Sequence, residues 1–162
     1  MYDKVLKSEP YVSESTILFF PNYYDFVRVR GFLKRASEPI PFLAISEYTS
    51  NADVSRARSH FFHGRNTLLL LTERAHFFRR FVYRHPAHVL LYGVPHYPQT
   101  YCDLANMLHP TESTDADGVT FRQRCTMRTL VTKLDASPLR YLVGIKRARK
   151  ILDQPLTQFS IE

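Results

Sequence analysis

The sequence predicts a single α/β domain built on a mainly parallel sheet of about five or six strands. Short apolar runs alternate five times with segments of helical periodicity, and the connections are short. Leu68–Leu71 places leucine at four successive positions, as expected for a strand buried on both faces of a helix-covered parallel sheet. A chain of 162 residues with 44% apolar residues is also long enough for one core of ordinary size.

The predicted strands are apolar runs bounded by residues that favour turns. Pro21 ends the first run, and Pro39 and Pro41 precede the second. The predicted strands are Thr16–Phe20, Phe42–Ile45, Thr67–Leu71, His88–Tyr92 and Met127–Thr132.

The predicted helices follow capping signals. Asn22 can cap the first helix, and Ser50 with Asp53 forms a variant capping box for the second, which Gly64 should stop. Ser137 followed by Pro138 predicts the start of the last helix. The expected helices are a segment from Tyr23 to Leu33, one from the Ser50 cap to Phe62, Glu73–Tyr83, Gln99–Leu108, and one from Pro138 to about Leu152.

The domain should therefore span residues 16–153. Residues 1–15 are expected to form a flexible arm, with a frayed terminus as an equal alternative, and residues 154–162 a tail. Residues 109–120 are rich in Thr, Ser, Asp and Glu near their start and are expected to form an exposed loop. No apolar run approaches the roughly 18–20 residues that a membrane span needs, so no membrane partner is expected.

The charge balance favours an acidic partner, with nucleic acid first. The formal net charge is +7, with 22 Lys and Arg against 15 Asp and Glu. Between Val54 and His85, seven arginines stand against Glu73 alone. Arginine suits bidentate contacts with phosphate, but plain solvation of a helix face explains these residues equally well. The seven are Arg56, Arg58, Arg65, Arg74, Arg79, Arg80 and Arg84.

Two further clusters have a structural interpretation beside a functional one. Aromatic residues between the arginines could stack on bases, although burial in the core is the preferred interpretation; they are Phe77, Phe78, Phe81 and Tyr83. A second basic cluster near the end of the last helix is best explained by the helix dipole, and consists of Lys146, Arg147, Arg149 and Lys150.

Several kinds of chemistry are not supported. The sequence has no G-x-x-x-x-G-K-[ST] phosphate loop, no G-x-G-x-x-G and no G-x-S-x-G. His60-x-x-His63 has no evident third ligand nearby, and Cys102 is interpreted as a buried small hydrophobic residue. Two cysteines exclude a disulfide scaffold and suggest a reducing compartment. No catalytic residue, cofactor, metal or small-molecule substrate is expected.

Several long motifs, in order, resemble one known family. They are Thr16–Arg30, Ile45–Thr49, Val54–Phe62, Leu70–Phe77, and Tyr97–Tyr101 running on into Asn106–Leu108. Together they resemble the C-terminal domain of the digestive-organ-expansion-factor family, which comprises nucleolar, helicase-like proteins of the small-subunit processome. The resemblance extends from about Thr16 to Leu152.

That family in turn resembles the second RecA-like domain of DEAD-box RNA helicases. Leu70–Glu73 matches a helicase strand that ends in Thr-Asp, where the threonine touches the RNA backbone, and Tyr92–Pro95 matches a strand ending in Tyr-Asp-x-Pro. Where helicases have Gly-x-Asp, this chain has Phe78–Arg80. The resemblance and the basic stretch together suggest the RNA-binding residues Arg56, Arg58, Thr72, Arg74, Arg79 and Arg80.

The helicase arginines are missing on this register. Tyr101 matches the tyrosine before H-R-x-G-R-x-x-R, which puts Asp103 at the histidine and Leu104, Met107 and Pro110 at the arginines. Arginine fingers of this kind contribute about 10³–10⁵ in rate, so the resemblance implies no ATP hydrolysis. An active helicase half completed by another chain is disfavoured for the same reason.

The resemblance implies a noncatalytic, helicase-like component of ribosome biogenesis in the nucleolus. Its expected partners are pre-rRNA, small nucleolar RNA and processome proteins. The alternative is a protein–protein scaffold in the same assembly without direct RNA contact.

Overall fold

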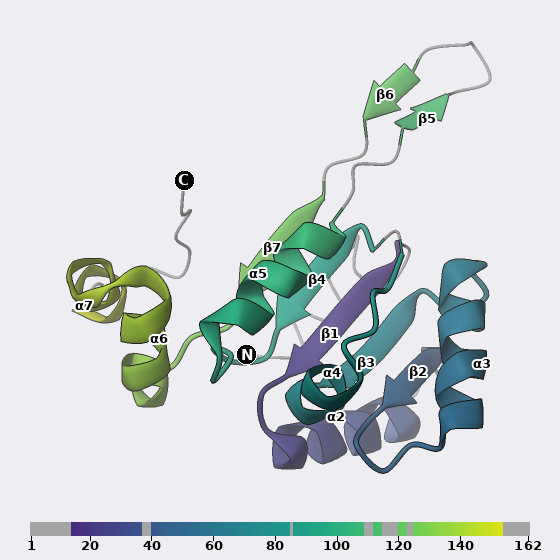
Figure 1. The fold of residues 1–162 in the computed structure, drawn as a ribbon, viewed down its shortest axis with the longest axis horizontal. Helices are drawn as coiled ribbons and strands as arrows, with labels where there is room; N and C mark the ends of the chain where they lie inside the picture. Colours follow the sequence, from purple (N-terminus) through teal and green to yellow (C-terminus); the bar gives the residue numbers. More distant parts are fainter. Residues whose placement is uncertain are drawn as a thin grey trace.

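The computed structural model describes residues 14–36, 40–84, 86–108, 112–114, 120–122 and 125–153. A five-stranded sheet of order β2-β3-β1-β4-β7 lies at its centre (Figure 1), and every pairing in it is parallel. The prediction of a mainly parallel α/β sheet is confirmed. The strands are β1 Thr16–Phe20, β2 Phe42–Ile45, β3 Leu68–Thr72, β4 His88–Leu91 and β7 Thr126–Thr129.

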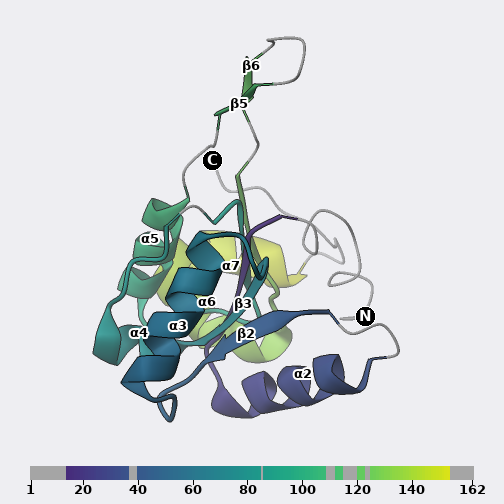
Figure 2. The ribbon, with the colours of Figure 1, turned by 90° about the vertical axis from the view of Figure 1, so that its right-hand side faces the viewer.

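Helices cover both faces of the sheet, as buried parallel strands require. Figure 2 shows α2 on one side of the sheet and α3, α4 and α5 on the other. Alternate residues of β1 serve the two layers, because Ile17 and Phe19 join the core under α3–α5 whereas Leu18 and Phe20 pack with α2. These helices are α2 Tyr23–Arg35, α3 Asn51–Phe62, α4 Glu73–Arg79 and α5 Pro98–Met107.

Helix α4 is shorter than predicted. The expected helix ran to Tyr83, but α4 ends at Arg79 and Arg80 adopts a left-handed conformation with φ of 46°. The chain then continues without helix through residues 81–84, where Phe81 is half-buried and Tyr83 buried against the core. Apolar residues here therefore reach the core from a non-helical segment, which the sequence spacing does not distinguish from a helix.

The predicted last helix is two helices. Gly144 separates α6 Ala136–Val143 from α7 Ile145–Asp153 and has φ of 84°, a conformation that side-chain-bearing residues rarely adopt. The predicted Ser137 cap is also wrong, because a 3₁₀ turn, η1 Lys133–Asp135, precedes α6 and a capping box between Thr132 and Asp135 opens it. Both differences arise from local backbone geometry within an otherwise helical pattern.

The region predicted as an exposed loop contains regular structure. β5 Glu112–Thr114 and β6 Thr120–Arg122 form an antiparallel pair, so residues 109–120 are not simply a loop. The rest of that region, the predicted arm up to residue 13 and the predicted tail 154–162 lie outside the described residues. No described helix has the length and apolar character that a bilayer crossing requires.

Candidate nucleic-acid interface

Most of the predicted RNA-binding residues lie in or next to α4, the helix that follows β3 at the carboxyl edge of the sheet. In open parallel sheets this edge is where ligands usually bind. Thr72 ends β3 and caps α4, Arg74 lies in the first turn of that helix, and Arg79 and Arg80 lie at its end. The structure therefore brings these four together, whereas Arg56 and Arg58 project from α3.

The Thr72 hydroxyl is occupied by hydrogen bonds within the protein. The side chain is 2% exposed, its hydroxyl donates to Glu47 Oε2 at 3.0 Å, and it accepts from the Ala75 amide at 3.3 Å. A buried hydroxyl with both roles filled has little capacity for a phosphate. Arg74 differs, because its Nε lies 3.9 Å from Glu47 Oε1 while 66% of the side chain remains exposed.

Arg79 and Arg80 have unlike surroundings. Arg79 donates to Asn51 Oδ1 at 2.7 Å and to the Thr49 carbonyl at 2.6 Å, so it fastens the loop between β2 and α3 to the end of α4. Arg80 is exposed, and its guanidinium carbon lies 5.8 Å from the centroid of the Phe77 ring. Of these two arginines, Arg80 is the one that the structure leaves available to a ligand.

Glu73 has a structural role, holding the loop before α5, that the sequence did not reveal. Its side chain is only 4% exposed and accepts from the His96 amide at 3.0 Å and the Tyr97 amide at 3.4 Å. The His96 ring Nδ1 lies 2.6 Å from Glu73 Oε2. A carboxylate in the first turn of α4 is favoured by the helix dipole, and here it holds the loop between β4 and α5. The only signal in the sequence is its place directly after a capping threonine.

That loop places an aromatic ring beside α4. Tyr97 stacks on Phe77 with ring centroids 5.4 Å apart, and Phe78 meets Phe77 edge-on at 5.6 Å. Their exposures are 44% for Phe77, 68% for Phe78 and 54% for Tyr97. The prediction of a core role is thus wrong for Phe77 and Phe78, although it is confirmed for Tyr83.

We call this surface the aromatic platform; it consists of Phe77, Phe78, Tyr97, Arg74 and Arg80. Arg74, Phe77 and Phe78 share one face of α4 because they are three and four residues apart. Exposed rings offer faces to unpaired bases, and neighbouring guanidinium groups can meet phosphates. The platform therefore has the chemistry of a single-stranded nucleic-acid contact.

His76 lies on the opposite, buried side of α4. Its side chain is 4% exposed, neither ring nitrogen has a hydrogen-bond partner, and Nε2 lies 3.6 Å from Asp103 Oδ2. Burial lowers the pKa of His76, with the nearby Asp103 carboxylate opposing that shift. The histidine is accordingly neutral near pH 7, and the ring packs edge-on against Phe19.

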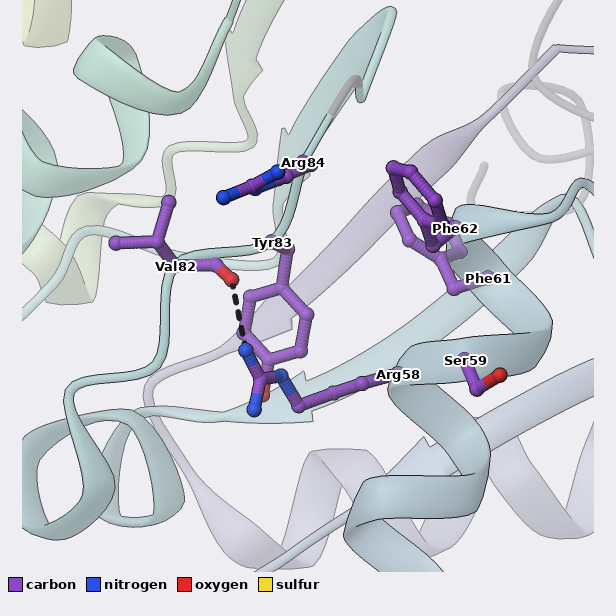
Figure 3. Close-up of a pocket in the computed structure, with 7 residues that line it drawn as sticks. All are labelled: Arg58, Ser59, Phe61, Phe62, Val82, Tyr83 and Arg84. Atoms are coloured by element: carbon purple, nitrogen blue, oxygen red, sulfur yellow. Dashed lines mark hydrogen bonds between the residues drawn. The ribbon is translucent and has the colours of Figure 1, made fainter.

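Arg58 lines a shallow pocket of about 260 Å³ between α3 and the segment after α4 (Figure 3). Its guanidinium carbon lies 4.3 Å from the centroid of the Phe81 ring, and Nη2 donates to the Val82 carbonyl at 3.5 Å. Burial raises the pKa of Tyr83, at the pocket floor, to about 12. Arg58 thus joins α3 to the segment after α4, and its guanidinium group is engaged by contacts within the fold.

Arg56 belongs to a second groove, of about 350 Å³, beside the edge strand β2. It pairs with Asp53 at 3.2 Å, which offsets part of its charge. Arg30 and Lys34 of α2 line the same groove. The sequence did not group them with Arg56, because the topology brings α2 and α3 to opposite sides of one edge strand.

The positions assigned to helicase arginines face the core. Leu104 is fully buried and Met107 is 5% exposed, both packed under α5 against the sheet. Pro110 lies outside the described residues. Cys102, predicted to be buried, is exposed on the other side of α5. Within the described ranges no three His, Cys, Asp or Glu residues gather as a metal site would require.

Comparison with known sequences identifies similar proteins. The family model for the Utp25 C-terminal domain matches residues 2–161. The U3 small nucleolar RNA-associated protein 25 homolog of Mus musculus is 38% identical over 144 residues, which cover 89% of this chain and 18% of that protein. Its Schizosaccharomyces pombe counterpart is 38% identical over 143 residues, covering 88% and 21%. The chain thus spans about a fifth of the length of these relatives.

Solved structures show the same fold at low sequence identity. The E. coli DEAD-box protein SrmB, bound to regulator of ribonuclease activity A, matches with a TM-score of 0.61 and 19% identity, over 86% of this chain and 72% of that one. The C-terminal domain of the DEAD-box protein Dbp5 matches with a TM-score of 0.56 and 17% identity, over 85% and 69%. The expected RecA-like fold of a second helicase domain is confirmed.

Proposed function

Because this chain belongs to the Utp25 C-terminal domain family, we propose that it is a noncatalytic, helicase-like module that binds RNA and protein during ribosome biogenesis. Its place of action is the small-subunit processome in the nucleolus. Its partners are pre-rRNA, small nucleolar RNA and processome proteins. The relatives named U3 small nucleolar RNA-associated protein 25 support this assignment.

The observation that carries the RNA contact is the aromatic platform. Three partly exposed rings lie beside two arginines at the carboxyl edge of the sheet. A ring that stacks on a base must have an accessible face. Phe78 has one, because it is 68% exposed and is not needed to fill the core. Arg74 and Arg80 add positive charge without being buried.

The noncatalytic part of the proposal rests on the side chains at the positions that the resemblance assigns to the helicase arginines. Leu104 and Met107 are apolar and packed in the core, so neither can stabilise charge on a transferring phosphoryl group. The sequence also contains no phosphate loop. The domain therefore serves as a binding surface.

A protein scaffold without RNA contact is the second candidate. Val82 favours it, because this apolar side chain is 61% exposed and lies two residues after Arg80. An exposed valine can pack against a protein but cannot pair with a phosphate. Crosslinking in the assembled particle separates the two functions. Crosslinks to RNA from residues 74–97 support the module proposed above, and crosslinks to protein alone from residues 56–84 support the scaffold.

Single substitutions test the platform directly. Phe78→Ala should weaken binding of the chain to a fluorescent single-stranded RNA by about 1–3 kcal/mol, the contribution of one stacked base. Tyr24→Ala is the matched control, because Tyr24 is an aromatic residue 78% exposed on α2, which covers the opposite face of the sheet from α4. Equal affinities for the Phe78 variant and the unmodified chain, measured by anisotropy, would remove the platform from the RNA site.

A further inference from the structure

Helix α7 concentrates positive charge on one side. Lys146, Arg147, Arg149 and Lys150 are all exposed, while Ala148 is fully buried against Val94 and Leu139. At 3.6 residues per turn the four cations span an arc of about 160°. Ile151 and Leu152, partly buried, lie on the opposite side with Ala148. The apolar side fixes the helix and the basic side faces solvent.

The helix dipole does not explain this charge, contrary to the interpretation drawn from the sequence. Since Gly144 breaks the predicted long helix, Lys146 and Arg147 fall in the first turn of α7, where the dipole disfavours cations. No acidic residue lies in that turn, and only Lys150 lies in the last turn.

The cations also repel one another. Lys146 lies three and four residues before Arg149 and Lys150, the spacings at which like charges on a helix are destabilising. Asp153, the last residue of α7, is on the same side, yet the part of the chain that the structure describes shows no ion pair for any of the four. Nothing described within the fold offsets this charge.

We propose that the basic side of α7 binds the phosphate backbone of RNA, a second contact that rests on the RNA-binding function proposed above. A protein partner needs apolar area to bury, and the four cations offer little. A phosphate backbone needs only cations, which release its counterions on binding. The preceding helix, α6, also exposes a cation and a ring, Arg140 and the 78% exposed Tyr141.

This surface is separate from the aromatic platform. Figure 1 shows α6 and α7 at the β7 end of the sheet, beyond α5, with α3 at the opposite, β2 end. The two contacts can be removed independently because they share no residue.

The test is salt-dependent binding of the 162-residue chain to a fluorescent uridine 20-mer. One variant carries Gln at Lys146, Arg147, Arg149 and Lys150. A control removes the same charge from α2, with Gln at the exposed Arg28, Arg30, Lys34 and Arg35. Glutamine is a good helix former, and circular dichroism checks that both variants keep their helices.

We expect the α7 variant to lower the slope of log affinity against log salt by up to about 3, at about 0.7 for each of four phosphate contacts, and the control by less than about 1. Equal losses in both variants, or an unchanged slope for α7, would overturn the inference while leaving RNA binding intact. No binding by the unmodified chain would overturn the RNA function itself. Binding that depends on α7 for poly-L-glutamate but not for RNA would assign this surface to an acidic protein.

Discussion

Replacement of Glu73 by glutamine tests whether one buried carboxylate holds the platform together. The carboxylate accepts from the His96 and Tyr97 amides and from the His96 ring, at distances between 2.6 and 3.4 Å. Hydrogen bonds to a charged group contribute about 1.5–3 kcal/mol and neutral ones about 0.5–1.5. Glu73→Gln keeps one amide oxygen to accept but loses the charge, and an amide is easier to bury than a carboxylate.

The net expectation is a loss of about 1–2 kcal/mol in the free energy of unfolding. For a domain of 150–250 residues each kcal/mol shifts Tm by roughly 2–4 °C, so the Tm of the Glu73→Gln variant should be about 2–8 °C lower. RNA affinity should fall as well, because the loop that carries Tyr97 loses its anchor beside Phe77.

Asp25→Asn provides the matched control. Asp25 is also an acid in the first turn of a helix, but it is partly exposed, and among the described residues its ion pair is with Arg28 at 3.8 Å. Its loss should cost about 0.3–1 kcal/mol through the helix dipole and leave RNA binding unchanged. If Glu73→Gln changes Tm no more than Asp25→Asn, the Glu73 carboxylate does not hold the loop between β4 and α5 beside α4.

Three further substitutions test the fold around the site. Leu104→Ala should lower stability by about 2–5 kcal/mol, seen as a lower urea midpoint, because Leu104 is fully buried; a change near zero would contradict its core position. Burial lowers the pKa of His76 below 6.5, so the folded state binds fewer protons than the unfolded state as the pH falls. The protein should therefore lose stability below about pH 6.5. The urea midpoints at pH 7.5 and pH 5.5 should differ less in His76→Leu than in the unmodified chain. Gly144→Ala should cost about 1–3 kcal/mol through its positive φ, and no loss of Tm would mean that α6 and α7 can join as one helix.

The strands of this domain could be predicted because each is a continuous apolar run with a clear end. Leu69–Leu71 is buried whichever way the side chains point, so the pattern leaves little choice of structure. The helix ends were harder, because Arg80 and Gly144 change the backbone direction inside segments that look helical throughout. A single residue with positive φ leaves no periodic signal.

The site was predicted only in part because its contacts join distant segments. Arg79 meets Thr49 across 30 positions, and Glu73 meets His96 across 23. Periodicity reports which side of a helix is buried, not which loop lies opposite. The arginine-rich stretch therefore indicated the region of the candidate site, while the structure separates cations that hold loops from those that face solvent.

Whether this domain binds RNA without hydrolysing ATP is tested by measuring RNA binding and phosphate release in one sample of the 162-residue chain with ATP and magnesium. We predict RNA binding that weakens steeply with salt, with phosphate release at background level whether or not RNA is added. RNA-stimulated release that disappears when Thr72 or Arg74 is replaced would contradict it.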